Sequence, residues 1–428
     1  MRVLWFANIM TGYKPLETDI KSPYNGGGWL QAAMTAIKEE QHIQLGYSSM
    51  LSGEPFKTQQ DNVTYYPIPS PYHSLAAKIW NQLKYLTPLA SYADEEKSWD
   101  YYLHYFKLII DDFQPDIIHI WGSERHFGLI YKITNIPIVL HIQGIITPYF
   151  NAFLPPFISW KAYKTISINP RVYIQRLITK STWEKDIFRE HKIITGIKYH
   201  MGRTEWDQRI TKLINPDAQY FHVDEILRDI FYDMAERHIP DKLVIVTTIS
   251  QPIYKGFDLV LKTAKILKSV DDLEFEWLCY GNINPYIIEK QIGIYHKDVN
   301  VKLMGAVSAN DLKSAELNAT LYVHPSYIDN SPNSICEAQI LGIPVVSTNT
   351  GGIPSIITDK EDGFLIPAND PYQAAYFILQ LFKDKSLNQE MGIKAKRKAL
   401  NRHHPHKVIQ QILAVYNHVL SEHDKPIQ

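Results

Sequence analysis

The chain alternates short apolar runs with longer stretches in which apolar residues recur at the helical period. The apolar runs are 3–7, 117–121, 136–142 and 194–201 in the first half, and 243–249, 275–280, 299–303, 319–324 and 344–347 in the second half. Short apolar runs between helix-period stretches are typical of parallel strands that helices cover on both faces. The pattern therefore predicts an α/β fold with two doubly wound parallel sheets, each in its own domain.

A polar stretch at 233–241 separates the two sets of runs and marks the predicted domain boundary. The first domain then covers residues 1–238 and the second covers residues 239–405. A last helical stretch, 406–428, can pack on either domain, and a return to the first is one of the two options. In open parallel sheets, ligands bind beyond the carboxyl ends of the strands. We therefore expect a cleft where the strand-end loops of the two domains face each other.

Composition narrows the class of protein. The 428 residues are 45% hydrophobic and 21% charged, as in a folded globular chain, and the formal net charge of −1 disfavours nucleic acid binding. The two cysteines, Cys279 and Cys336, match no metal-ligand spacing and no disulfide framework, which favours a reducing, cytoplasmic compartment. The apolar run in residues 1–8 is too short for a signal peptide, and no window reaches the ~18 unbroken apolar residues of a membrane span. We therefore expect neither export nor membrane insertion.

The most informative stretch, residues 322–354, reads YVHPSYIDNSPNSICEAQILGIPVVSTNTGGIP. Ser331 suits the N-cap of a helix, Pro332 its first position, and Gly342 its end. The first free amides of this helix would form an anion site with the positive end of the helix dipole behind them. The residues that carry these amides are Asn333, Ser334 and Ile335. Glu337 lies in the same helix, and its carboxylate can reach toward the same cleft because helical side chains lean toward the N-terminus.

The spacing from Asp329 to Glu337, with SPNS between them and EAQILGIPVV after them, resembles the signature of retaining GT-B glycosyltransferases. The resemblance is to their glycogen-synthase-like family four, glycosyl transferases group 1. It implies two Rossmann-like domains, a nucleotide-diphosphate sugar donor and no obligatory metal. It also implies that Asp329, which stands where Glu is usual, contacts the donor sugar, and that Glu337 contacts the nucleotide ribose. The alternative is that Asp329 begins a turn and Glu337 is a solvated helix residue.

A second element of the resemblance lies at 247–267, where KGFD precedes an amphipathic helix. In the family an Arg and Lys pair neutralises the donor diphosphate, which implies that role for Lys255. The usual Arg falls at Ser250, so another cation such as Arg203 or Lys14 would have to replace it. The alternative for Lys255 is an ordinary solvated lysine, although a cation is disfavoured at the start of a helix.

Glycines contribute further candidates for donor binding. The run that ends in Gly27 and Gly28 follows the first strand and precedes a helix, so it resembles the family's N-terminal glycine loop, which faces the donor phosphates and the acceptor. Such a run also fits a simple turn. In the second domain, Gly351 and Gly352 close the signature stretch and are included in the donor-binding set.

Several residues are candidates for the acceptor side of the cleft. His141 and Gln143 share a face of their predicted strand, and related enzymes often have His where this chain has Gln143. Gln can hydrogen-bond a sugar hydroxyl but cannot act as an acid or a base. Arg203 is a further cleft candidate, since it lies at a strand end just before a helix N-cap. Another strand end carries the remaining candidates for an acceptor pocket, each of which can equally be a packing residue: His119, Trp121, Glu124 and His126.

Residues 157–192 interleave basic and aromatic side chains, a composition that can dock on anionic lipid headgroups. The alternative, a solvated helix face, is the usual reading of such a charge run. A lipid contact would place the protein at the inner face of the membrane.

Together these features predict a retaining glycosyltransferase that moves a sugar from a nucleotide-diphosphate sugar to a hydroxyl of a glycan, lipid-linked or small-molecule acceptor. The resemblance implies a role in polysaccharide or glycoconjugate biosynthesis. Two rivals remain open: a nucleotide-sugar epimerase of the same architecture, and a catalytically silent nucleotide-sugar-binding module. The replacements at Gln143, Ser250 and Asp329 motivate the second rival.

Overall fold

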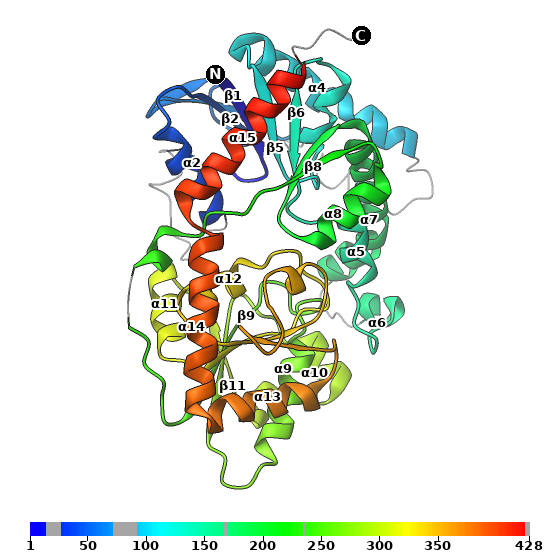
Figure 1. The fold of residues 1–428 in the computed structure, drawn as a ribbon. Helices are drawn as coiled ribbons and strands as arrows, with labels where there is room; N and C mark the ends of the chain where they lie inside the picture. Colours follow the sequence, from blue (N-terminus) through cyan, green and yellow to red (C-terminus); the bar gives the residue numbers. More distant parts are fainter. Residues whose placement is uncertain (14–26, 72–91, 166–169, 234–235, 424–428) are drawn as a thin grey trace.

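The computed structural model describes residues 1–13, 27–71, 92–165, 170–233 and 236–423, and contains two parallel sheets stacked end to end (Figure 1). Among these residues, the first sheet has the strand order β3-β4-β2-β1-β5-β6-β7-β8 and the second has the order β11-β10-β9-β12-β13-β14. Every strand pair is parallel except β3 with β4. The prediction of two doubly wound sheets is confirmed.

The first sheet consists of β1 (Arg2–Ala7), β2 (Gln44–Met50), β3 (Thr58–Gln60), β4 (Val63–Ile68), β5 (Ile117–Trp121), β6 (Ile138–His141), β7 (Tyr199–Gly202) and β8 (Gln219–His222). Its helices are α2 (Gly28–Lys38), α4 (Tyr92–Phe113), η1 (His126–Lys132), α5 (Ile146–Asn151), α6 (Trp160–Thr165), α7 (Pro170–Gly196) and α8 (Glu205–Ile214). Side chains alternate between the two faces, so Trp5 packs with α2 on one face while Phe6 packs with α4 and η1 on the other.

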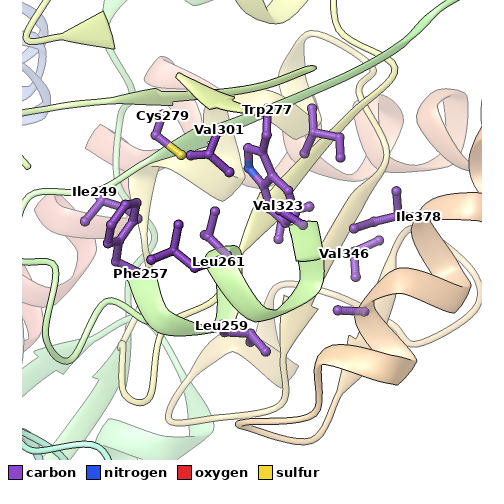
Figure 2. Close-up of a cluster of buried hydrophobic side chains, with 14 of the residues drawn as sticks. Ile249, Phe257, Leu259, Leu261, Trp277, Cys279, Val301, Val323, Val346 and Ile378 are labelled. Carbon is purple, nitrogen blue, oxygen red and sulfur yellow. The ribbon is translucent and has the colours of Figure 1, made fainter. Parts of the chain in front are cut away.

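The second sheet consists of β9 (Leu243–Thr248), β10 (Phe275–Tyr280), β11 (Val301–Gly305), β12 (Leu321–His324), β13 (Val345–Thr348) and β14 (Phe364–Ile366). The accompanying helices are η2 (Asp229–Tyr232), α9 (Phe257–Lys268), α10 (Tyr286–Ile292), η3 (His296–Val299), α11 (Ala309–Leu317), α12 (Asn333–Ile340), η4 (Ile353–Ser355), α13 (Pro371–Lys383) and α14 (Lys385–Arg402). Figure 2 shows one face of its core, where Phe257 and Leu261 of α9 pack against Trp277 of the sheet.

The last helix, α15 (Pro405–His423), packs on the first domain. It follows α14 directly, and Figure 1 shows the two helices running from the second domain back to the first. Tyr416 of α15 is fully buried, accepts a hydrogen bond from Trp5 Nε1 at 2.9 Å, and lies 2.5 Å from His119 Nδ1. The stretch predicted as 406–428 therefore returns to the first domain, although its last residues, 424–428, lie outside the described part of the chain.

The predicted strand at 194–201 is wrong in its first part. Helix α7 continues to Gly196, and strand β7 begins only at Tyr199. Ile193, Ile194 and Ile197 form the buried end of that helix, and periodicity cannot separate a short buried helical run from a strand. The hydrophobic pattern also missed β2, β3, β4, β8 and β14, and several other predicted strands are one to three residues shorter than expected.

None of the described helices combines the length and the apolar composition that crossing a membrane requires.

Candidate functional site

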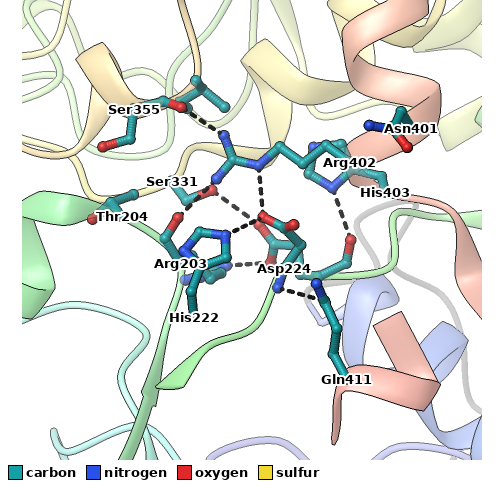
Figure 3. Close-up of polar contacts among 12 residues, drawn as sticks. Arg203, Thr204, His222, Asp224, Ser331, Ser355, Asn401, Arg402, His403 and Gln411 are labelled. Carbon is teal, nitrogen blue, oxygen red and sulfur yellow. Dashed lines mark hydrogen bonds and ion pairs between the residues drawn. The ribbon is translucent and has the colours of Figure 1, made fainter. Parts of the chain in front are cut away.

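The carboxyl ends of both sheets meet at the domain junction, where side chains from the two domains bond directly. Figure 3 shows one part of this junction, in which Arg402, at the end of α14, contacts three segments. Its guanidinium donates to Asp224 Oδ1 at 2.9 Å, to the carbonyl of Ser355 at 3.1 Å and to the carbonyl of Arg203 at 2.9 Å. Arg402 thus ties the segment after β8 to the second domain.

Asp329 lies in the loop between β12 and α12 and is surrounded by three polar partners. Lys255 Nζ forms an ion pair with its carboxylate, His324 Nε2 lies 3.0 Å from Oδ2, and the Tyr149 hydroxyl of the first domain donates to Oδ1 at 3.1 Å. Burial alone would raise the pKa of Asp329, but the charge of Lys255 and the hydrogen bond from His324 outweigh it and hold the pKa below its usual range. The structure thus brings together two of the predicted site residues, with Asp329 as a buried anion.

The start of α12 differs by one position from the prediction. The helix begins at Asn333 with Pro332 as its N-cap, and no side chain caps it. Ser331, the predicted cap, instead has its hydroxyl 3.3 Å from Glu225 Oε1 of the segment after β8. The local sequence predicted that the Ser331 hydroxyl caps the helix. In the structure this hydroxyl instead contacts a buried carboxylate of the first domain.

The first amides of α12 point into the domain junction. In the described part of the chain, the N–H groups of Asn333 and Ser334 donate to no acceptor, whereas the N–H of Ile335 donates to the carbonyl of Pro332 at 3.0 Å. The Asn333 side chain, with its amide oriented to satisfy both ends, donates to Glu225 at 2.6 Å. Two of the three predicted amides are thus unpaired at this helix end, as the predicted anion site requires.

Glu337, one turn further along α12, is 4% exposed and is held by Arg228 in a two-pronged ion pair. Arg228 Nε donates to Oε1 and Nη2 donates to Oε2, each at 2.7 Å. Burial raises the pKa of Glu337, and Arg228 opposes this by stabilising the charged form. Glu337 is therefore not the solvated helix residue of the alternative interpretation.

Arg203 is 5% exposed and directly follows β7. It forms an ion pair with Glu225 and donates to the carbonyl of Gln143 at 3.0 Å. The side-chain nitrogen of Gln143 has no hydrogen-bond partner among the described residues. Two cations were proposed to replace the Arg that the family usually has at the position of Ser250. Arg203 is already paired, and Lys14 lies outside the described residues.

Asn330, next to Asp329, bonds only across the junction. Its side chain accepts from the Thr204 hydroxyl at 2.6 Å and donates to Asp207 Oδ2 at 2.8 Å and to the carbonyl of Gln143 at 3.2 Å. Its backbone N–H lies 3.2 Å from the Tyr149 hydroxyl, which accepts from it. One short side chain therefore fixes the loop of the second domain against the first.

The predicted glycines lie at positions where the backbone packs closely or takes a left-handed conformation. Gly351 (φ 55°) and Gly352 lie against the backbone of Asp329 and Asn330, so close that a Cβ at either position would collide with a carbonyl. Gly27 precedes α2 as its left-handed N-cap, while Gly28 opens that helix beside Arg228. The rest of the predicted glycine run, 25–26, lies outside the described residues.

Most of the acceptor candidates are not at the junction surface. His141 is 1% and Trp121 is 3% exposed, and the two rings stack with centroids 4.6 Å apart. His126 stacks on Tyr102 of α4 with ring centroids 3.9 Å apart. Burial therefore places His141 and Trp121 in the packed interior, whereas His126 is half-buried and also lies 3.7 Å from the carboxylate of Glu95.

Glu124 lies in the loop after β5, next to the loops that follow β1 and β6. Asn8 Nδ2, after β1, donates to its Oε2 at 3.2 Å, and its other oxygen lies 3.8 Å from where a Cβ on Gly144, after β6, would stand. The carboxylate folds back over Gly122 (φ 94°), where any Cβ would collide with it. A partly exposed carboxylate thus sits where three strands of the first sheet end.

The aromatic residues of 157–192 pack inward. Phe153 lies 5.9 Å from Trp160, 5.4 Å from Tyr163 and 5.3 Å from Trp183, centroid to centroid, and this group joins the core of the second domain. Tyr173 and Ile174 remain about 40% exposed on α7. Packing therefore accounts for most of the aromatic half of the lipid-docking prediction.

Two surface hollows lie away from the junction. One of about 670 Å³ borders Lys242, His296 and Lys302, and one of about 540 Å³ borders Asp362 and Lys398. Neither includes a residue of the site above. Within the described ranges, no group of three His, Cys, Asp or Glu side chains is arranged to hold a metal ion.

The sequence did not identify several residues that build the junction. Asn330 and His324 lie within the signature stretch and could have been noted there, since they flank Asp329. For three others no local motif gives a signal, because their partners in the second domain lie more than 100 residues away: Tyr149, Glu225 and Arg228.

Comparison with known proteins finds a family match in the second domain. Residues 232–398 match the family described as glycosyl transferases group 1. A D-inositol 3-phosphate glycosyltransferase of Corynebacterium diphtheriae is 29% identical over 35% of this chain and 36% of its own length. The capsular polysaccharide biosynthesis glycosyltransferase CapM of Staphylococcus aureus is 23% identical over 53% and 52%. The matches thus span about a third to a half of these relatives.

Solved structures resemble the whole chain in fold. Sucrose-phosphate synthase from Thermosynechococcus elongatus superposes with a TM-score of 0.69 at 12% identity, covering 99% of this chain and 100% of that one. Alr3699/HepE of Anabaena, in complex with UDP and glucose, superposes with a TM-score of 0.64 at 15% identity, covering 97% and 99%. The match to the glycosyl transferases group 1 thus covers the second domain, which carries the signature of residues 322–354, and the two sheets that meet at their carboxyl ends give the whole chain the GT-B fold.

Proposed function

We propose that this protein is a retaining glycosyltransferase that uses a nucleotide-diphosphate sugar as donor. The observation that carries the proposal is the start of α12, where the unpaired amides of Asn333 and Ser334 lie one turn from the carboxylate of Glu337 at the domain junction. Amides at a helix N-terminus suit a diphosphate, and a fixed carboxylate suits the hydroxyls of a ribose. That Alr3699/HepE is a structure with bound UDP and glucose supports the same class of donor.

In the proposed reaction, the bond between the anomeric carbon and the diphosphate oxygen breaks, and the acceptor oxygen bonds to the same face of that carbon. The acceptor proton leaves with the nucleoside diphosphate. Negative charge that grows on the diphosphate would be stabilised by the α12 amides and by Lys255, beside Asp329. Fixed groups of this kind stabilise a transition state without reorganising, so we propose that no resident metal is required.

We place the acceptor above Glu124 on the first domain. Its carboxylate is a partly exposed polar group in the loops that follow β1, β5 and β6, and a carboxylate accepts hydrogen bonds from sugar hydroxyls. Tyr149 links this region to the donor side, because its ring lies 3.4 Å from the Cβ position of Gly144 and its hydroxyl bonds Asp329. A glycan or polyol acceptor fits this arrangement. The name of CapM, a capsular polysaccharide enzyme, supports a polysaccharide or glycoconjugate product.

A lipid-linked acceptor is a narrower form of this proposal. Its support is the exposed pair Tyr173 and Ile174 on α7, with Lys180 exposed on the same helix. Sedimentation with vesicles that contain anionic lipids would test it, because Tyr173→Ser with Ile174→Ser should release the protein if this patch inserts.

The test of the transferase proposal has two stages. Thermal shift with the diphosphates of uridine, guanosine and adenosine should show stabilisation by at least one of them, since binding to the native state raises apparent stability. The sugar nucleotides of that base are then incubated with a panel of monosaccharide acceptors, and the product linkage is assigned by NMR. Glu337→Ala should abolish stabilisation and transfer, while Glu361→Ala, on an exposed surface, should change neither.

The same two experiments distinguish a transferase from the two rivals, an epimerase and a silent binding module. Conversion of the donor to an isomeric sugar without acceptor would indicate an epimerase. Stabilisation by a nucleotide without transfer to any acceptor would indicate a binding module. Product with inverted configuration would contradict the retaining mechanism alone.

A further inference from the structure

Arg228 lies outside the family signature, in the segment that joins β8 to η2 and thereby the two domains. Its guanidinium meets the carboxylate of Glu337 through two parallel bonds of 2.7 Å. Fork-to-fork contacts of this kind fix the orientation of a carboxylate as well as its charge. Arg228 is therefore the residue that sets how Glu337 faces the junction.

Two further contacts define the course of the Arg228 side chain. Its guanidinium lies 4.8 Å from the centre of the Phe231 ring. Its Cγ and Cδ would stand 2.7 and 2.8 Å from a Cβ at Gly28, the first residue of α2. The side chain thus passes from the interdomain segment, over the glycine at the start of α2, to the donor helix of the second domain.

We propose that Arg228 is a positioning residue that orients Glu337 for recognition of the donor ribose, and that Gly28 has no side chain because Arg228 passes there. The inference rests on the proposed function, in which Glu337 meets the ribose. A carboxylate has about four lone-pair directions. The guanidinium of Arg228 occupies two of these lone-pair directions, so two remain to accept hydrogen bonds from the neighbouring hydroxyls of a ribose.

The surroundings of Glu337 explain why it needs this partner. Glu316 of α11 is fully buried, both of its carboxyl oxygens lack a hydrogen-bond partner among the described residues, and burial together with the charge of Glu337 raises its pKa well above the ordinary value. Without Arg228, two carboxyls would share one buried region with no cation between them. A buried charge without a partner is costly, so Glu337 would lose both its charge and its fixed orientation.

The test is calorimetric titration of UDP, GDP and ADP, each beside its 2′,3′-dideoxy analogue. The wild type should prefer the ribose form of its nucleotide. Arg228→Gln should weaken binding of that form at least about tenfold, the loss typical of hydrogen bonds to a charged group, and should change binding of the dideoxy form less than about twofold. Arg209→Gln is the matched control, since it removes an arginine from an exposed pair with Glu205 and should change neither.

Gly28→Ala supplies a second variant that keeps the arginine. The added methyl should displace the Arg228 side chain, so the same selective loss for the ribose form is expected. In a background that already carries Arg228→Ala, the Gly28→Ala change should have no further effect on either affinity, because the collision partner is gone.

The outcomes separate the inference from the function on which it rests. Equal losses for the ribose and dideoxy forms in Arg228→Gln would overturn it, since they would place Arg228 on the phosphates or in general stability. Unchanged affinities in that variant would overturn it as well. Failure of the wild type to bind any of the three nucleotides would overturn the proposed function, and this inference with it.

Discussion

Several buried carboxylates at the domain junction pair with a cation. Asp329 pairs with Lys255, Glu225 with Arg203, and Glu337 with Arg228. A buried carboxylate that loses its cation costs about 3–5 kcal/mol, so each of these pairs matters to the stability of the junction. At this scale, a single substitution changes both stability and chemistry, and an experiment must separate the two.

Lys255→Ala tests whether this lysine acts on the donor. We expect turnover to fall at least about 100-fold, the loss typical of removing one fixed group that stabilises developing negative charge. Lys262→Ala is the matched control, because it also removes the cation that pairs with a buried aspartate, Asp258. We expect the two variants to lose a similar amount of thermal stability, and only Lys255→Ala to lose turnover. Equal turnover in both would contradict the donor role.

Glu190 supplies a residue-scale prediction on pH. It is buried in α7, where the Ser123 hydroxyl donates to Oε1 at 2.6 Å and the N–H of Ile146 donates to Oε2 at 2.7 Å. Burial raises the pKa of Glu190 to about 8 from an ordinary value of 4.5. The folded state therefore holds a proton that the unfolded chain releases above about pH 4.5, so rising pH lowers stability until about pH 8, by at most about 1.4 kcal/mol per unit.

Glu190→Gln should remove that dependence, because an amide carries no charge in either state. In urea unfolding between pH 5 and 8, the free energy of unfolding of the variant should increasingly exceed that of the wild type as the pH rises. Glu184→Gln, at a position on the same helix whose side chain is 44% exposed, should track the wild type. A difference that stays constant with pH would show that Glu190 is ionised in the folded protein.

Elements with a strong local pattern were predictable, and elements that depend on distant partners were not. Helix α12 was predicted to within one residue of its start from Pro332 and a closing Gly342, because these signals are local, whereas the expected Ser331 cap is taken by a distant partner. Strand β2 was missed because it buries Ser48 and Ser49 as well as apolar residues, and the Ser48 hydroxyl is satisfied by the carbonyl of Tyr66 on the neighbouring strand. Hydrophobicity alone does not reveal a polar group whose partner lies on another strand.

Helix α15 is an element whose place only the tertiary structure could assign, and one residue shows how it is held. Tyr416 bonds both Trp5 and His119 inside the first domain. Tyr416→Phe keeps the ring but leaves two buried polar groups without this partner, so we expect a loss of about 1–3 kcal/mol in the free energy of unfolding by urea. Nucleotide affinity should not change.

Tyr372→Phe removes a hydroxyl of the same kind from a side chain that is 74% exposed, and should leave stability unchanged. A Tyr416→Phe variant as stable as the wild type would mean that apolar packing alone holds α15 on the first domain.

At the scale of the whole molecule, the site exists only because the two domains meet. The sequence indicated the donor residues that share one motif, Asp329 and Glu337, but not the first-domain or interdomain residues that hold them, Tyr149 and Arg228. Those contacts join positions 109 or more residues apart, and their register is set by how the two sheets face each other. No period or spacing in a single chain encodes that arrangement.

Asn330→Ala tests whether this juxtaposition is required for function. The change removes three side-chain hydrogen bonds across the junction, to Thr204, Asp207 and Gln143, while the backbone bond to Tyr149 remains. Asp207 and Gln143 keep contacts with Arg203, so the expected loss is about 2 kcal/mol, or about a 30-fold shift away from the closed arrangement. Small-angle X-ray scattering should then report a larger radius of gyration, and turnover should fall while nucleotide affinity falls less, because the α12 amides and Glu337 belong to one domain.

Asn318→Ala, which removes an exposed amide from the end of α11, should leave both measurements unchanged. Scattering and turnover like those of the wild type in Asn330→Ala would show that other contacts, such as those of Arg402, suffice to hold the domains together.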